Sequence, residues 1–273
     1  MTPGQPEHPD PKHPDTDHLS PATRVVALGR EAAAPGQQVG APLVLSSTYH
    51  AGGEVMYARS GNPTWSAFEQ ALGDLEGGDA LVFASGMAAV SAALSLLPHG
   101  GTVVAPDAAY NGVVATLEAR EAEGSATVRR VDVTDTAAVI AALDGADLLW
   151  LESPTNPLLE VADLPTLLGA ARDQGVLSVV DNTFATPLLQ RPLEHGADVV
   201  VHSVTKYLAG HSDVLLGAVV TASTPAGRAL HERVPHHDHR RGPPPPDVLD
   251  HVALRRGRLP RDQPDRTRQE GQL

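Results

Sequence analysis

The stretch that decides the fold is Ala197-Asp198-Val199-Val200-Val201-His202-Ser203-Val204-Thr205-Lys206-Tyr207. Its apolar run is continuous rather than alternating, which predicts a strand that is buried on both faces. The polar residues that follow, Lys206 among them, then stand at the carboxyl end of a strand. Open α/β sheets bind their ligands at that edge, so the stretch predicts a ligand site.

Apolar runs of strand length flank this stretch and alternate with helix-length segments. The expected strands cover residues 80–84, 102–106, 126–131, 146–152, 176–181, 197–202 and 214–221. The expected helices lie near residues 63–76, 87–97, 111–123, 135–143, 163–174 and 187–195. This alternation predicts an α/β fold with a mainly parallel, seven-stranded sheet and helices on both faces. Only a loop joins the last two strands, so one of them is expected to run antiparallel.

Lysine is nearly absent from the chain, which has two lysines, Lys12 and Lys206, against 18 arginines. This imbalance suggests that arginine serves wherever charge alone is needed. Lysine differs from arginine because its neutral amine can form a Schiff base with an aldehyde. Position alone also fits an ordinary surface lysine, but the neighbouring hydroxyls of Ser203 and Thr205 suit a phosphate.

Two further features fall at strand ends. The segment Ala84-Ser85-Gly86-Met87 joins a strand to a helix, and the free N–H groups of such a turn attract phosphate. Asp181 ends another strand, where a carboxylate can pair with a protonated pyridine nitrogen. Each feature alone is also typical of an ordinary turn or helix cap. A lysine, a phosphate cradle and such an aspartate together describe a pyridoxal 5′-phosphate (PLP) site.

Motifs and composition disfavour other functions. The chain has no G-x-G-x-x-G after its first strand, no Walker A loop and no G-x-S-x-G. It has no Cys, which excludes disulfides and a cysteine nucleophile. Its net charge of -13 argues against nucleic-acid binding. No apolar run approaches the roughly 20 residues of a membrane span, and the polar start resembles no signal peptide. We expect a cytoplasmic protein that binds neither nucleic acid nor membrane.

Charge and aromatic content divide the chain. Residues 1–227 carry 10 Lys and Arg against 26 Asp and Glu, whereas residues 228–273 carry 10 Arg against 7 acids and no aromatic residue. We therefore expect a disordered arm over residues 1–40, a PLP-binding large domain over 41–227 and a disordered tail over 228–273. The tail's His236-His237-Asp238-His239 is expected to lie in solvent rather than to bind a metal.

Six stretches carry a resemblance to a known family. They are YARSGNPT (57–64), SGM (85–87), DAAYNG (107–112), ESPTNP (152–157), DNTFATP (181–187) and residues 196–217. In residues and in order they are similar to the Cys/Met-metabolism family of PLP enzymes, the family of cystathionine γ-synthase and of the cystathionine lyases. The resemblance covers about residues 40–225. It implies fold type I, with a large domain like that of aspartate aminotransferase.

The resemblance also implies roles for individual residues. Lys206 would hold PLP covalently and move protons, and Tyr110 would stack on the ring and act in acid–base chemistry. The other implied cofactor contacts are Gly86, Met87, Ser203 and Thr205 at the phosphate, Asp181 at the ring nitrogen, Asn156 near the ring oxygen, Thr183, and Tyr57 and Arg59 at a neighbouring subunit's phosphate. From the residues alone, Asn156 also fits a turn former, Tyr110 ordinary packing, and Tyr57 and Arg59 plain surface groups.

The implied reaction is γ-elimination or γ-replacement on a homoserine-derived amino acid, of the cystathionine γ-synthase or γ-lyase type. O-acetylhomoserine sulfhydrylase and methionine γ-lyase are alternatives within the family. An inactive fragment is an alternative of another class. The resemblance implies a homodimer or homotetramer, with residues 41–65 in contact with a partner subunit.

Family chains continue into a small C-terminal domain that supplies the arginine for the substrate carboxylate. Here residues 226–234, which follow the six stretches, are still similar to the family, and the similarity then stops before any such domain. We therefore expect that domain to be missing, through truncation or a frameshift, and assign the arginine's role to no residue of the tail.

Overall fold

The computed structural model describes residues 16, 18–30, 33–53, 55, 57–58 and 61–234. Arg59, the histidine cluster at 236–239 and most of the expected tail lie outside the described residues. The elements are α1 (Pro21–Ala27), α2 (Pro63–Glu76), β1 (Gly78–Phe83), α3 (Gly86–Leu94), β2 (Gly101–Pro106), α4 (Asn111–Ala122), β3 (Ala126–Val131), α5 (Thr136–Ala142), β4 (Leu148–Glu152), α6 (Leu164–Asp173), β5 (Leu177–Asp181), α7 (Thr186–Leu189), η2 (Pro192–His195), β6 (Val199–His202), β7 (Gly217–Ala222) and α8 (Pro225–Arg233). Within this part of the chain, no helix is both long and apolar enough to cross a membrane.

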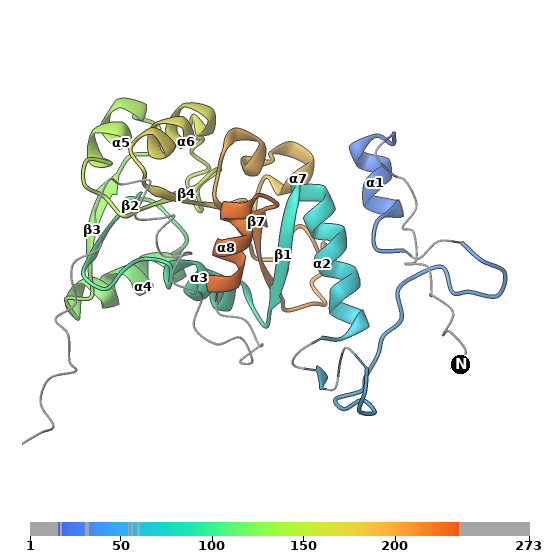
Figure 1. The fold of residues 1–273 in the computed structure, drawn as a ribbon. Coiled ribbons are helices and arrows are strands. Elements are labelled where there is room, and N and C mark those ends of the chain that lie inside the picture. The colour runs from blue at the N-terminus through green and yellow to red at the C-terminus, as the bar shows by residue number, and fades with distance from the viewer. Residues whose placement is uncertain are drawn as a thin grey trace, which may run out of the picture.

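The strands form a single seven-stranded sheet in the order β1-β7-β6-β5-β4-β2-β3 (Figure 1). The pairs from β6 through β5, β4 and β2 to β3 are all parallel. Strand β7 is antiparallel to both of its neighbours, β1 and β6. The expected seven-stranded, mainly parallel sheet is therefore confirmed, and so is the one reversed strand.

Helices cover both faces of the sheet, which explains the continuous apolar strand runs. One core cluster packs α3, α4 and α8 against strand residues such as Trp150, Val179 and Val201. The other packs α2, α5 and α6 against alternate residues of the same strands, such as Val180 and Val200. Figure 1 shows α5 and α6 on one side of the sheet and α3 and α4 on the other. The central strands therefore lie between two helical layers.

Helix caps fix the two helices that frame the carboxyl edge of the sheet. The Asn62 side chain accepts a hydrogen bond from the Thr64 N–H (2.8 Å), and Pro63 occupies the first turn of α2. Gly77, with φ 83°, ends α2 in the left-handed conformation. Ser85 caps α3 by accepting from the Ala88 N–H (3.1 Å). The start of α3 is thereby held next to the end of β6.

Two expected elements differ in the structure. The helix expected over 187–195 is split into α7 and η2, because Arg191 precedes Pro192 and takes a non-helical conformation (φ -128°, ψ 87°). The strand expected over 214–221 begins later, at Gly217, because Leu216 instead exchanges hydrogen bonds with Thr205.

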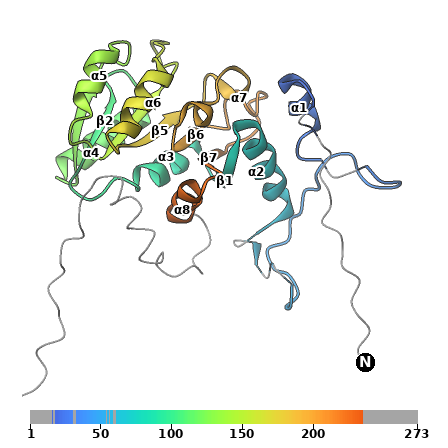
Figure 2. The same cartoon turned by 45° about the horizontal axis from the view of Figure 1, so that its top comes forward.

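Ordered structure also extends beyond the expected domain bounds. Residues 21–27, assigned to the N-terminal arm, form α1, which is capped by Ser20 and lies beyond α2 (Figure 2). The Arg24 side chain donates to the carbonyl of Asp74 at 3.1 Å and so ties α1 to α2. At the other end, α8 runs past residue 227, and Leu230 and Val234 are buried against the sheet.

Candidate active site

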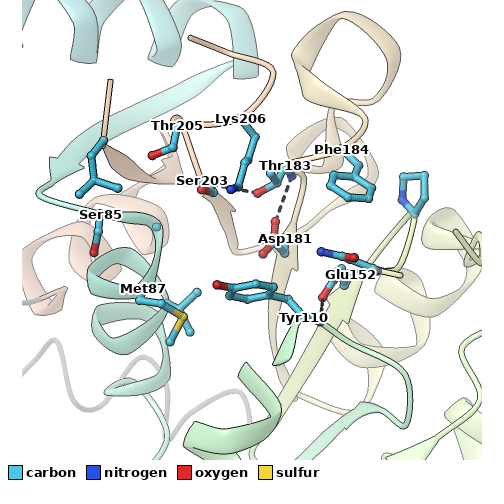
Figure 3. A pocket seen from close by; sticks show the side chains of 15 residues that line it. Ser85, Met87, Tyr110, Glu152, Asp181, Thr183, Phe184, Ser203, Thr205 and Lys206 are labelled. Carbon is cyan, nitrogen blue, oxygen red and sulfur yellow. Dashed lines mark hydrogen bonds between the residues drawn. The ribbon is translucent and has the colours of Figure 1, made fainter. Parts of the chain in front are cut away.

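A cavity of about 200 Å³ opens at the carboxyl ends of β4, β5 and β6, beside the start of α3. Among the residues expected at the site, those that line it are Gly86, Met87, Tyr110, Asn156, Asp181, Thr183, Ser203, Thr205 and Lys206. Figure 3 shows the side chain of Lys206 pointing into this cavity from the loop after β6. Ser85, Val90, Glu152, Pro154, Phe184 and Leu215 complete the lining.

The start of α3 forms one wall of the cavity. The first N–H groups of a helix have no partner within it, so Gly86 and Met87 present amide donors here. Ser203 lies directly against this turn: a Cβ on Gly86 would fall 2.8 Å from Ser203 Cβ. The space around Gly217 is smaller still, because a Cβ added there would lie 2.1 Å from the Ser85 carbonyl oxygen. Gly86 therefore permits the close approach of α3 to the loop after β6, and Gly217 permits that of β7 to the start of α3.

The two hydroxyls near Lys206 are bonded differently. Thr205 Oγ1 donates to the Leu216 carbonyl at 3.1 Å and accepts from the Leu216 N–H at 2.9 Å. The Ser203 N–H donates to Thr183 Oγ1 (2.8 Å), and the Ser203 carbonyl accepts from the Lys206 N–H (3.0 Å). Thr205 thus fixes the loop after β6, whereas the Ser203 hydroxyl is left to face the cavity.

Asp181 is the last residue of β5 and is 8% exposed. Burial raises the pKa of its carboxyl, against the hydrogen bonds from Thr183 and the nearby His202, which favour the charged form. Its carboxylate accepts from the Thr183 N–H at 3.0 Å. A cation in the cavity would relieve the cost of burying this charge, and a protonated ring nitrogen is such a cation.

Glu152 is a titratable lining residue to which no role was assigned from the sequence. It is the last residue of β4, is 4% exposed and is the direct cross-strand partner of Asp181. Burial, and secondarily the charge of Asp181, raise its pKa to about 7. Its position could have indicated a role, because Glu152 is a carboxylate at the end of a buried strand that neighbours the strand of Asp181.

The three aromatic side chains near the cavity come from different loops. Tyr110 precedes α4, is 42% exposed and points into the cavity (Figure 3). The rings of Phe184 and Tyr207 lie 5.6 Å apart, between their centroids, with an interplanar angle of 50°. Tyr57 does not line the cavity: it forms an isolated bridge with Thr48 and is 41% exposed.

The cavity therefore joins three chemical functions. Asp181 offers a buried carboxylate to a ring cation, and the α3 amides with the Ser203 hydroxyl offer donors to an anion such as phosphate. Lys206 offers an amine to an aldehyde. These are the groups that PLP presents, so the residues fit this cofactor.

Comparisons with known proteins also indicate a PLP-dependent enzyme. A family described as Cys/Met metabolism PLP-dependent enzyme matches residues 22–244. The chain is 42% identical over 208 residues to a cystathionine beta-lyase of Coxiella burnetii, covering 72% of this chain and 53% of the relative. It is 42% identical over 210 residues to a cystathionine gamma-synthase of Mycobacterium bovis, covering 74% of this chain and 54% of the relative. The chain thus spans about half the length of the curated relatives it matches.

The fold agrees as well. The crystal structure of cystathionine gamma synthase from Xanthomonas oryzae pv. oryzae in complex with cystathionine aligns with a TM-score of 0.73 and 37% identity, covering 86% of this chain and 59% of that chain. Such neighbours are fold-type I PLP enzymes, as the resemblance implied. The family match reaches residue 244, beyond the expected boundary at 227. By its sequence, its fold and the groups in its cavity, the chain belongs to the Cys/Met metabolism family of PLP-dependent enzymes.

Proposed function

We propose that this chain binds PLP at Lys206 and takes part in trans-sulfuration, by γ-elimination or γ-replacement on a homoserine-derived amino acid. The observation that carries the proposal is that Lys206, Asp181 and the start of α3 line one cavity. Its relatives include a cystathionine gamma-synthase and a cystathionine beta-lyase, which supports the same substrate class. PLP bound here would supply an electron-withdrawing ring that acidifies the substrate Cα–H bond.

Each residue expected to line the cavity has a proposed task. Asp181 holds a proton on the ring nitrogen, while the N–H groups of Gly86 and Met87 and the Ser203 hydroxyl hold the phosphate. Lys206 Nζ takes the proton from the substrate Cα, after which loss of a Cβ proton permits the γ-substituent to leave. The remaining proposed cofactor contacts are Asn156 near the ring oxygen, Tyr110 against the ring, Thr183 beside Asp181, and Thr205 through the loop that it fixes.

A visible-absorption measurement tests the cofactor site. Purified full chain mixed with PLP is expected to develop a visible band that survives gel filtration and that borohydride abolishes. Lys206→Ala removes the attached amine, and Lys206→Arg is the matched control that keeps the charge but cannot form the covalent bond. We expect neither variant to show the band. A wild-type chain without the band, or variants that retain it, would overturn the proposal.

A second reaction, β-elimination, is a candidate because the Coxiella burnetii lyase is as identical to this chain as the Mycobacterium bovis synthase, at 42%. The products that form from L-cystathionine and water distinguish β-elimination from γ-elimination. Cleavage at Cγ yields cysteine, 2-oxobutanoate and ammonia, whereas cleavage at Cβ yields homocysteine, pyruvate and ammonia. Chromatography of the 2-oxo acids therefore assigns the elimination reaction. A chain that binds PLP, forms neither 2-oxo acid and also makes no cystathionine from an O-acylhomoserine and cysteine behaves as an inactive fragment.

We further propose a homodimer or homotetramer in which Tyr57 and Arg59 reach the cavity of a neighbouring subunit. Support comes from the large apolar side chains exposed in the segment before α2 and at the carboxyl edge of the sheet. They include Leu43, Leu45, Leu158, Leu159, Leu189, Tyr207 and Leu215, all at least 60% exposed. An apolar surface of this kind is typical of a subunit interface. A cytoplasmic location is proposed on the acidic, cysteine-free composition.

A further inference from the structure

The side chain of Glu152 joins two loops that come from different parts of the fold. Its Oε2 accepts a hydrogen bond from the Tyr110 N–H at 2.9 Å, and its Oε1 accepts one from the Asn156 N–H at 2.7 Å. Tyr110 ends the connection between β2 and α4, whereas Asn156 belongs to the turn after β4. One buried carboxylate therefore spans both loops, with one oxygen for each.

Glu152 also has a fixed place relative to Asp181. The two residues are paired in the register of β4 and β5, so their side chains leave the sheet on the same face. Both line the cavity, as does Tyr110 (Figure 3). Asn156, the other residue whose backbone Glu152 binds, lines it as well. One carboxylate beside Asp181 thus binds the backbones of both residues.

We propose that Glu152 is a positioning residue of the cofactor cavity: its carboxylate holds Tyr110 and Asn156 at a fixed distance from Asp181, and so shapes the space for the PLP ring. This inference rests on the proposed function. A carboxylate suits the task because it is acceptor-only, so that each oxygen can take an N–H. An amide replaces one of these acceptors with a donor group, which leaves one N–H without a partner, and protonation of the carboxyl weakens one of the two acceptors.

The protonation state of Glu152 depends on whether a cation in the cavity pairs with Asp181. The titratable groups that face it across the cavity are Asp181 from β5, Tyr110 before α4 and Lys206 from the loop after β6. Asp181 disfavours the Glu152 carboxylate while its own charge is unpaired. A ring cation paired with Asp181 cancels that repulsion. Cofactor binding and the deprotonated, loop-holding form of Glu152 therefore favour each other.

The test compares Glu152→Gln with Asp198→Asn in the full chain. Asp198 makes a similar carboxylate bond to the Ser178 N–H (3.0 Å), but at the amino edge of the sheet and outside the cavity. PLP affinity is measured by absorbance titration, and thermal unfolding of each cofactor-free variant reports its stability. We expect Glu152→Gln to weaken PLP binding about ten- to a hundredfold and to shift the visible band, while Asp198→Asn stays within about twofold of wild type.

The outcomes separate this inference from the proposed function. Wild type that fails to bind PLP refutes the function itself. Wild type that binds PLP while a folded Glu152→Gln binds it equally well refutes only the positioning role. An equal loss of affinity in Asp198→Asn also refutes it, because the effect would then follow general destabilisation. Should Glu152→Gln not fold, Glu152→Asp gives the same comparison, since the charge remains but the shorter side chain cannot span both N–H groups.

Discussion

Oε1 of Glu76 lies 2.6 Å from Nε2 of His202, and both side chains are fully buried. Glu76 ends α2, while His202 ends β6 just before Ser203. The same carboxylate oxygen accepts from Asn182 Nδ2 at 2.8 Å, and Asn182 follows Asp181. Gln190, which caps the end of α7, donates to Asn182 Oδ1 at 3.0 Å. The network thereby extends to α7. A buried polar network therefore joins the ends of β5 and β6 to α2.

Removal of His202 is expected to destabilise the fold strongly. His202→Leu leaves the buried Glu76 side chain without that hydrogen-bond partner, a change that costs about 1–3 kcal/mol of unfolding free energy. Urea denaturation measures it. The matched control is Glu121→Gln, which breaks the half-exposed pair with Arg130 (3.1 Å) and should cost less than about 1 kcal/mol. A loss below 1 kcal/mol in His202→Leu would show that the buried bond contributes little.

The pH dependence of stability follows from Glu152. Its pKa is raised from 4.5 to about 7, so the folded chain holds a proton between these values that the unfolded chain releases. Stability therefore falls as pH rises through this window, and Glu152 alone contributes a loss of about 3 kcal/mol by pH 7. Asp181, whose pKa is also raised, adds a loss of the same sign.

Urea unfolding of the cofactor-free chain between pH 5 and 7.5 checks this slope. Glu152→Gln cannot titrate, so its unfolding free energy should change much less over the same range. A variant slope equal to that of wild type would mean that Glu152 is not the titrating group.

The sequence predicted the strands and the helical layers, because both follow from apolar runs that are buried on both faces of the sheet. Runs such as Val199-Val200-Val201 are apolar at every position, so both the strands and their two helical layers could be inferred before any contact was known. The start of the last strand was missed because Leu216 bonds to Thr205 across a loop, an alternative that no local pattern reveals. The early end of α7 was missed although Pro192 marked it, because residues 187–195 have the length of one helix between two strands.

The candidate site could be predicted for those of its residues that stand at the carboxyl ends of strands. Residues that end strands or follow them directly, such as Asp181 and Ser203, meet at one edge in a parallel sheet. Glu152 was harder to assign because its task depends on two backbone N–H groups rather than on side chains. Glu76 and His202 are 126 residues apart in sequence, so their bond requires the folded chain.

The two hydroxyls beside Lys206 should respond differently to substitution. Ser203→Ala removes a cavity-facing donor and is expected to weaken PLP binding about tenfold with little effect on stability. Thr205→Val removes both side-chain hydrogen bonds to Leu216, so it should also lower the unfolding free energy by about 1–2 kcal/mol. Absorbance titration and urea unfolding of both variants measure these effects. Equal stability losses would contradict the separate roles.

Subunit complementation tests whether Tyr57 serves a neighbouring cavity. Lys206→Ala and Tyr57→Phe should each impair cystathionine turnover when prepared alone. If Tyr57 reaches across the interface, a mixed dimer contains one cavity with an intact Lys206 and an intact Tyr57. After the two variants are unfolded and refolded together in equal amounts, about a quarter of the wild-type activity should return, since half the dimers are mixed and each has one intact site. Refolding each variant separately is the control. If the mixture stays as inactive as its components, Tyr57 does not complete the site of a partner.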